Sequence, residues 1–271
     1  MRFILLFLIL LLLLPAARLR AGGSPAAEML RRYTAAVAER LPGRVAHALA
    51  RINDPARRLL AIRYYLNRSD SEIVAKWAWS PEEIEAFRRS DLYGTTIFEL
   101  RKVQHAFEER NPGYALDVRM EIRTLGDQIH KWNNVGSVGS IAAMLHDTLM
   151  RWMADSTTML DSVPTPVGMD CFVVFLRSFQ PPSPPTVAVP GLSQHGQLRA
   201  FDFRIRRRGR VVAGGSSDRI AREWDLPGWT ARLHEAICAV SDRFSGPLEE
   251  PYEPWHYAFV HITPNVLAGT Q

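Results

Sequence analysis

The stretch Tyr114-Ala-Leu-Asp-Val-Arg-Met-Glu-Ile-Arg123 decides the fold class, because apolar and polar residues alternate along it as they do in a β-strand. Before it, apolar residues recur at three- and four-residue steps, which is typical of amphipathic helices. The helices expected in this region are 27–41, 55–66, 69–77, 81–90 and 95–109. A strand that follows such a region predicts an α+β fold, in which a small mixed or antiparallel sheet with flanking helices follows a helical N-terminal extension.

Later segments are expected to complete the sheet. Phe201–Val212 is expected to form a long strand that turns back near Gly209, and Trp255–Ile262 to form a final strand. The apolar run Gly168–Phe175 is expected to be a short buried strand. Five prolines in residues 180–190 predict a rigid loop. Further helices are expected at 141–153, 218–224 and 229–244.

The N-terminus has the pattern of an export signal. Arg2 supplies a positive start, Phe3–Leu14 is an apolar run too short to span a bilayer comfortably, and small residues follow from Pro15. We therefore expect a signal peptide at 1–21 and an exported protein, periplasmic or extracellular, with an uncleaved N-terminal anchor as the alternative. Contact with the membrane is expected only through this segment. The remaining chain is expected to divide into a helical region, 22–94, and a mixed domain, 95–265.

Composition excludes several classes of protein. The chain has 271 residues, of which 47% are hydrophobic and 23% charged, so disorder, a collagen-like repeat and a coiled-coil rod are excluded. The formal net charge is +5, but Arg2, Arg18 and Arg20 lie in the expected signal segment. The excess that remains is small and unclustered, so no nucleic-acid partner is expected.

Two cysteines lie in the expected exported portion. Cys171 and Cys238 could form a disulfide in an oxidising compartment. Alternatively, both are buried thiols that behave as small hydrophobic side chains. Because the chain has no Cys-x-x-Cys motif, a cysteine-ligated zinc site is not expected.

Two short segments concentrate groups that bind metals. The first runs from Ser193 to Asp202 and contains His195, and the second is Glu253-Pro-Trp-His-Tyr257. A catalytic zinc ion takes three protein ligands from His and Asp or Glu, and it works with a base that is not a ligand. The candidate ligands are His195, Asp202 and His256, and the candidate base is Glu253.

The spacing requires the chain to bend twice. Fully extended, the chain from His195 to Asp202 would span more than about 20 Å, so it must fold back, which Gly196 makes easier. Glu253 and the histidine three residues later would face opposite ways on an ideal strand, and Pro254 favours a bend that brings them together. Trp255 is expected to pack beneath the site. The other histidines are expected to be surface or core residues: His47, His105, His130, His146, His234 and His261.

These motifs resemble the zinc D-Ala-D-Ala carboxypeptidase family, which includes VanY-type and VanX-type enzymes and phage-type L-Ala-D-Glu endopeptidases. The family pattern S-x-H-x-x-G-x-A-x-D, followed by E-x-W-H, is matched by Ser193, His195, Ala200, Asp202, Glu253, Trp255 and His256. The chain departs from it at the glycine position, which is Leu198. A third family feature, an Arg-Ser/Thr pair with Gln five residues after the Arg, is matched by Arg123, Thr124 and Gln128 at the start of a polar turn.

The resemblance implies a zinc-dependent hydrolysis of an amide bond in peptidoglycan stem peptides. The metal would be Zn²⁺, held by His195, Asp202 and His256. Glu253 would act as the general base and Arg123 would stabilise the oxyanion. Substrate orientation would come from Ser193 and Gln128.

The alternatives concern which bond is cut, and whether any bond is cut. A carboxypeptidase that removes the terminal D-Ala is the preferred interpretation, and it needs a cation for the terminal carboxylate, for which Arg177, Arg199 and Arg204 are candidates. The proline-rich loop 180–190 would wall one end of the cleft. An endopeptidase of the same family and a non-catalytic, zinc-containing cell-wall-binding module are the other interpretations, the last favoured by Leu198.

Overall fold

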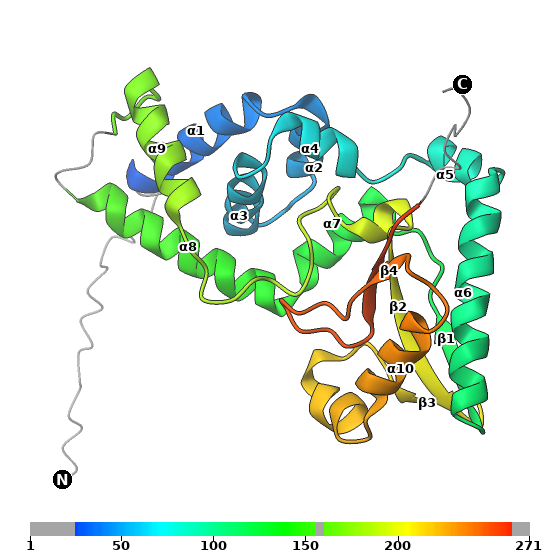
Figure 1. The fold of residues 1–271 in the computed structure, drawn as a ribbon. Helices are drawn as coiled ribbons and strands as arrows, with labels where there is room; N and C mark the ends of the chain where they lie inside the picture. Colours follow the sequence, from blue (N-terminus) through cyan, green and yellow to red (C-terminus); the bar gives the residue numbers. More distant parts are fainter. Residues whose placement is uncertain (1–24, 156–159, 262–271) are drawn as a thin grey trace, which may run out of the picture.

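The computed structural model describes residues 25–155 and 160–261 (Figure 1). The predicted signal peptide and Ile262 lie outside the described residues. Within the described ranges, no helix has both the length and the apolar character needed to cross a membrane.

The N-terminal region is helical, as predicted. Its helices are α1 (Pro25–Glu39), α2 (Gly43–Ala50), α3 (Pro55–Leu66), α4 (Asp70–Lys76), α5 (Pro81–Arg88) and α6 (Asp91–Arg110). The starts of α3, α4 and α5 are fixed by Asp54, Ser69 and Ser80, whose side chains each accept a hydrogen bond from a main-chain N–H in the first turn.

Three helices follow β1: α7 (Leu125–Asn134), α8 (Gly136–Ala154) and α9 (Pro166–Ser178). The expected turn after Arg123 is in fact the start of α7, because Thr124 and Asp127 form a capping box. The expected buried strand at Gly168–Phe175 is wrong. That segment lies in α9, which Thr165 caps, and its buried residues Met169, Phe172 and Leu176 recur at helical spacing.

The strands are β1 (Tyr114–Val118), β2 (Ala200–Arg207), β3 (Arg210–Ala213), β4 (Phe244–Ser245) and β5 (His256–Phe259). They form one antiparallel sheet in the order β1-β2-β5-β4, with β3 also paired to β2. The predicted hairpin is confirmed, since Arg208 and Gly209 take φ values of 47° and 77° between β2 and β3. This small sheet with its flanking helices confirms the α+β fold.

The remaining short elements are η1 (Gln194–Gln197), η2 (Ser217–Arg219), η3 (Ala221–Asp225) and α10 (Trp229–Cys238). The expected helix at 218–224 is therefore a 3₁₀ turn followed by a π-type turn. The expected helix at 229–244 ends early, and Phe244 belongs to β4 instead.

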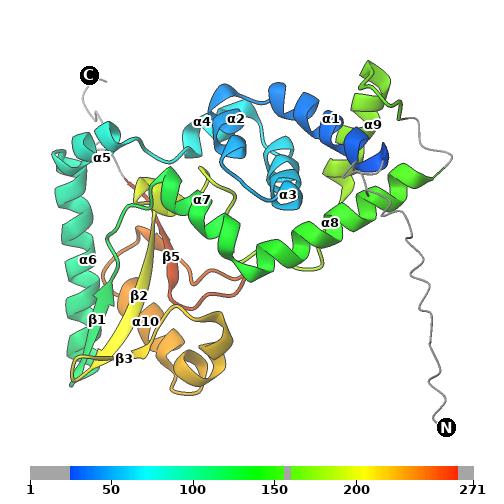
Figure 2. The same ribbon diagram turned by 180° about the vertical axis from the view of Figure 1, so that it is seen from behind.

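Two hydrophobic cores organise the molecule. The first core joins α1–α4 to α8 and α9, and the second joins α5, α6 and α10 to the sheet; Figures 1 and 2 show these two groups of elements on opposite sides of the molecule. Helices from both sides of residue 95 thus share the first core. The domain boundaries expected from the sequence remain predictions.

Strand β2 has one apolar and one polar face. Phe201, Phe203 and Ile205 are buried in the second core, whereas Asp202 and Arg204 are only partly buried. Because successive side chains point to opposite faces, this alternation directs the polar pair away from α6 and α10. The candidate site lies on that polar face.

The two cysteines are not paired. Cys171 lies on α9 and Cys238 on α10, and both thiols are free. Cys171 is half-buried and Cys238 is exposed, so the alternative expectation of two buried thiols is also wrong.

Candidate metal centre

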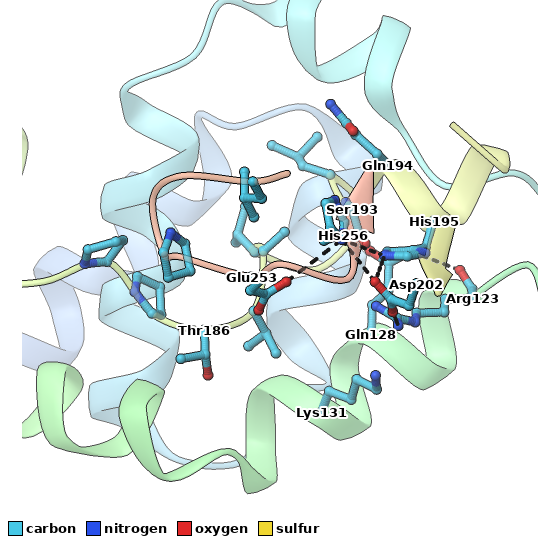
Figure 3. Close-up of a pocket in the computed structure, with 18 of the residues that line it drawn as sticks. Arg123, Gln128, Lys131, Thr186, Ser193, Gln194, His195, Asp202, Glu253 and His256 are labelled. Carbon is cyan, nitrogen blue, oxygen red and sulfur yellow. Dashed lines mark hydrogen bonds and ion pairs between the residues drawn. The ribbon is translucent and has the colours of Figure 1, made fainter. Parts of the chain in front are cut away.

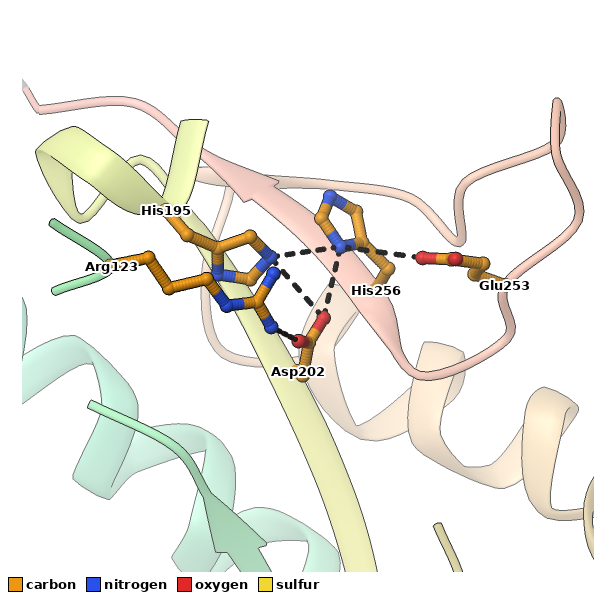
Figure 4. A network of polar contacts seen from close by, with 5 residues as sticks. All are labelled: Arg123, His195, Asp202, Glu253 and His256. Atoms are coloured by element: carbon orange, nitrogen blue, oxygen red, sulfur yellow. Dashed lines mark hydrogen bonds and ion pairs between the residues drawn. The ribbon is translucent and has the colours of Figure 1, made fainter. Parts of the chain in front are cut away.

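His195, Asp202 and His256 come together from three elements (Figure 4). His195 lies on η1, Asp202 on β2 and His256 at the start of β5. Asp202 and His256 are register partners in the antiparallel pair, so both side chains lie on the same face of the sheet. Among the described residues, these three form the one group of at least three metal-binding side chains whose ligand atoms lie within 4.8 Å of one another.

The spacing of the ligand atoms fits a tetrahedral ion. His195 Nε2 lies 3.3 Å from His256 Nδ1 and 3.4 Å from Asp202 Oδ1, and His256 Nδ1 lies 3.0 Å from Asp202 Oδ1. Ligands about 2.1 Å from a tetrahedral zinc ion lie about 3.4 Å from each other. Two imidazole nitrogens that converge on one carboxylate oxygen therefore present the donor set and separations that zinc takes. The group could bind a metal ion.

A tight turn returns the chain from His195 to β2. Leu198, at the family's glycine position, adopts the left-handed conformation (φ 49°, ψ 35°) that glycine takes most easily, and its side chain is buried. Gly196 is required by close packing, because a Cβ there would lie 2.6 Å from Gln128 Nε2 and 2.8 Å from Ala78 Cβ. Leu198 therefore makes the left-handed turn that a glycine would make at this position.

A second turn brings Glu253 to the same site. The main-chain N–H of His256 donates to the carbonyl oxygen of Glu253 at 3.0 Å, which forms the bend expected at Pro254. Glu253 Oε2 lies 3.7 Å from His256 Nδ1. The carboxylate thus faces the cluster from outside the group of three, as a base that is not a ligand would. Trp255 is buried against Trp224 in the second core, as expected.

Arg123 is part of the same network. Its Nη2 donates to Asp202 Oδ2, the carboxylate oxygen that faces away from the histidines, and its main-chain N–H donates to the carbonyl oxygen of His195 at 3.1 Å. Arg123 therefore fixes both the orientation of Asp202 and the position of the η1 turn. The sequence motif located Arg123 but gave no sign of its ion pair with Asp202.

The environment favours the protonation states that bind metal. Burial lowers the pKa of His195, which favours the neutral imidazole. Burial alone would raise the pKa of Asp202, but hydrogen bonds from His195 and His256 and the charge of Arg123 hold it well below its usual value. Burial raises the pKa of Glu253.

Gln128 and Ser193 adjoin the cluster in different ways. Gln128 is buried, and its amide is used by the main chain: Nε2 donates to the carbonyl oxygen of Arg123 at 2.9 Å, and Oε1 accepts from the N–H groups of Gly191 and Ser193 at 2.8 and 3.3 Å. Its observed role is to tie the Arg123 segment to the start of the metal motif. The side chain of Ser193 is half-buried and lines the pocket. The substrate contacts expected of both stay predictions.

The cluster opens into a pocket of about 700 Å³ (Figure 3). Pro184–Val189 lines it, so the proline-rich loop forms a wall, as expected. The loop is fixed to α8 by Thr186, whose Oγ1 lies 2.9 Å from Ser137 Oγ, and to α3 by Tyr65, whose hydroxyl donates to the carbonyl oxygen of Pro190 at 2.5 Å.

More cations than carboxylates line this pocket. The basic residues are Arg68, Lys76, Arg119, Arg123, Lys131 and Arg204, and the acidic residues are Asp202, Glu250 and Glu253. Of the arginines expected to bind a terminal carboxylate, Arg204 lines the pocket but is paired with Asp117 at 2.5 Å. Arg177 instead bonds the carbonyl oxygen of Leu66, and neither it nor Arg199 lines the pocket. Lys131 was missed by the sequence motifs.

The N-terminal helices hold the segment that carries His195. Gln197 Nε2 donates to the carbonyl oxygens of Ala75 and Trp77 at 3.0 and 2.9 Å. The N–H groups of Ala78 and Trp79 donate to Gly191 and Gly196, at 2.7 and 3.1 Å. The bracing role expected for these helices agrees with these contacts.

The remaining histidines lie outside the cluster. His47, His105, His130 and His234 are exposed, and His146 and His261 are half-buried. None belongs to the group of ligand atoms found in the described residues, in agreement with their expected surface or structural roles.

No protein-family model, curated protein sequence or solved structure matches this chain. The resemblance to the zinc carboxypeptidase family therefore rests on the motif residues and on the geometry that they adopt.

Proposed function

We propose that the chain is an exported, zinc-dependent peptidase of peptidoglycan stem peptides, and specifically a D-Ala-D-Ala carboxypeptidase. The observation that supports this most directly is the convergence of His195, Asp202 and His256 at tetrahedral spacing, with the carboxylate of Glu253 beside them. A purely structural zinc site has a closed set of protein ligands and needs no adjacent base.

The chemistry proposed for the site divides between the metal and Glu253. When bound, zinc supplies Lewis acidity, which lowers the pKa of a water molecule and polarises the carbonyl group of the scissile bond. Glu253 accepts the proton of that water and passes it to the leaving amine. Its position outside the ligand group keeps its carboxylate available for this transfer.

Arg123 combines two roles in this proposal. The contact with Asp202 uses one terminal nitrogen of the guanidinium, which has five N–H donors. The remaining donors can face the oxygen that becomes negative during the reaction. One such donor is worth about 3 kcal/mol of transition-state stabilisation in comparable sites.

Two features favour a carboxypeptidase over an endopeptidase. The proline-rich loop lines one wall of the pocket and is anchored at Thr186, which favours a substrate that ends in the pocket over one that continues past it. The excess of cations in the pocket suits a substrate with free carboxylates. Leu198 gives no support to the non-catalytic module, because it preserves the turn that a glycine would make.

The experiment is an incubation of the protein with purified muropeptides, with and without a chelator, followed by mass spectrometry of the products. The proposal predicts loss of one terminal alanine, abolished by the chelator and restored by zinc. Cleavage of an internal or cross-linking bond would instead assign an endopeptidase. A zinc-loaded protein that gives no product would contradict the peptidase proposal.

The matched variants are Glu253→Gln and Glu250→Gln, because both carboxylates line the same pocket but only Glu253 approaches the cluster. Glu253→Gln is expected to retain one zinc ion and lose turnover by at least about a hundredfold, the usual contribution of a positioned base. Glu250→Gln is expected to retain activity. Equal activity of wild type and Glu253→Gln would refute the role of this residue.

A further inference from the structure

Lys131 is a half-buried cation in the pocket. It extends from α7 toward the pocket, close to Gln128 (Figure 3). No hydrogen bond or ion pair joins its ammonium group to any of the residues that the structure describes. By contrast, Lys102 pairs with Glu99 at 3.2 Å, and Arg204 with Asp117 at 2.5 Å.

The half-buried position of Lys131 disfavours its charged form, and no ion pair with a described residue compensates for this. Burial is the largest influence and lowers the pKa of its ammonium group; the charges of Arg123 and Arg119 lower it further, whereas the carboxylates of Asp202 and Asp127 raise it. Buried charges are usually paired, so an unpaired cation that faces a pocket indicates a place for an anionic ligand.

A small recess lies between Lys131 and His195, the one residue of the metal cluster that lines it. It has a volume of about 150 Å³, and Arg119, Arg123, Lys131 and His195 contribute to its walls. That is the volume of about five water molecules, which suits one small residue rather than a length of chain. Two carboxylates also line it, those of Glu121 and Asp127, and Asp127 is already engaged by Thr124 in the α7 capping box.

We propose that Lys131 binds the free carboxylate of the C-terminal residue of a peptide substrate, and that the recess between Lys131 and His195 holds that residue. The inference rests on the proposed function and adds to it the residue that makes the enzyme prefer the free C-terminus of a peptide. The ammonium group offers three donors to a carboxylate, and a residue held in the recess would have its preceding peptide bond on the side of His195, the cluster residue that borders the recess. An amidated or extended chain would leave the cation unpaired.

The test measures binding apart from turnover. Acetyl-D-Ala-D-Ala and its C-terminal amide are titrated calorimetrically into zinc-loaded Glu253→Gln protein, with and without Lys131→Met. The free acid is expected to bind about 10- to 100-fold more weakly after Lys131→Met, the usual effect of removing one charge-assisted hydrogen bond. Binding of the amide is expected to change less than about twofold, because it never contacted the charge.

The chain has three lysines, and Lys102 supplies the matched control because it loses the same charge on α6, away from the pocket. Lys102→Met is expected to leave both affinities unchanged, and Lys131→Arg to restore part of the preference for the acid. Equal weakening of acid and amide by Lys131→Met, unchanged affinities, or no binding of the acid to the parent protein would each overturn the inference.

Lys131→Met also distinguishes failure of this inference from failure of the proposed function. In the otherwise wild-type enzyme, Lys131→Met is expected to raise KM for acids while kcat changes little, because the contact is made equally in the ground and transition states. If no alanine is released but the acid preference is lost with Lys131, the proposed function fails and the carboxylate site stands. If alanine is released and the acid preference survives Lys131→Met, the carboxylate site fails alone.

Discussion

Substitutions of Leu198 test whether burial of its side chain compensates for its left-handed backbone conformation in the turn between His195 and β2. Its left-handed conformation (φ 49°) costs a residue with a Cβ roughly 1 kcal/mol or more, and the residue remains there because its side chain is 1% exposed in the second core. Leu198→Ala removes the buried side chain and keeps the strain. Leu198→Gly removes both.

The stabilities of the two variants are therefore expected to be in the opposite order to the usual one, with the glycine variant more stable than the alanine variant. Leu198→Ala should lower the free energy of unfolding by about 2–5 kcal/mol, the usual cost of this truncation in a core. Leu198→Gly should cost about 1 kcal/mol less than alanine, because glycine relieves the left-handed strain. At ordinary positions glycine is the more destabilising of the two.

Urea denaturation at equilibrium, with the zinc-free protein, measures both values. The control is Leu233, a core leucine on α10 with ordinary helical geometry, at which glycine should destabilise more than alanine. A Leu198→Ala protein as stable as, or more stable than, Leu198→Gly would refute the account of the turn. A Leu198→Gly protein more stable than wild type would show that strain outweighs burial.

Three further predictions concern the network around the cluster. Arg123→Met should weaken zinc binding by about 10- to 100-fold, because Asp202 Oδ2 loses the group that orients it. The control variant Arg119→Met should leave zinc affinity unchanged. Competition with a chromophoric chelator measures the zinc affinity of both variants. Gln128→Ala should lower the free energy of unfolding by about 2–4 kcal/mol, because it leaves three main-chain groups without their partner, and an unchanged urea midpoint would contradict this. Zinc at a hundred times its dissociation constant should stabilise the fold by about 2.7 kcal/mol. Loss of this stabilisation in Asp202→Asn would identify the cluster as the zinc site. The same stabilisation in Asp202→Asn would place the metal elsewhere.

Local signals explain which elements the sequence predicts correctly. The helix starts at Ser69 and Ser80 are encoded within four residues, because each cap and its partner are close in the chain. The error at Gly168–Phe175 arose because a short apolar run fits a buried strand or a buried helix equally well. The Thr165-Pro166 cap before it was the signal that could have decided between them.

In the candidate site, too, the sequence predicts what local signals encode and not the contacts between residues that are distant in the chain. The three candidate ligands and the candidate base Glu253 can be recognised in the sequence because they fall in two compact motifs. The partners of Arg123 and Gln128 are up to 79 residues away, and their identity depends on the fold. Lys131 belongs to no motif, and it is marked only by its position in the pocket without a partner among the described residues.

The helical region matters to the proposed chemistry because it holds one candidate metal ligand in place. Asp202 and His256 are set by a strand pair that the second core supports, whereas His195 lies on a short 3₁₀ turn with little internal support. That turn is hydrogen-bonded through Gln197 to the main chain at the end of α4, and the loop before it is anchored to α3 and α8. A displacement of about 1 Å in such a ligand is a large fraction of a zinc–nitrogen bond of about 2 Å. The first core thus determines whether His195 completes the set, so stable packing of α3, α4 and α8 is a condition for metal binding rather than an independent property of the N-terminal region.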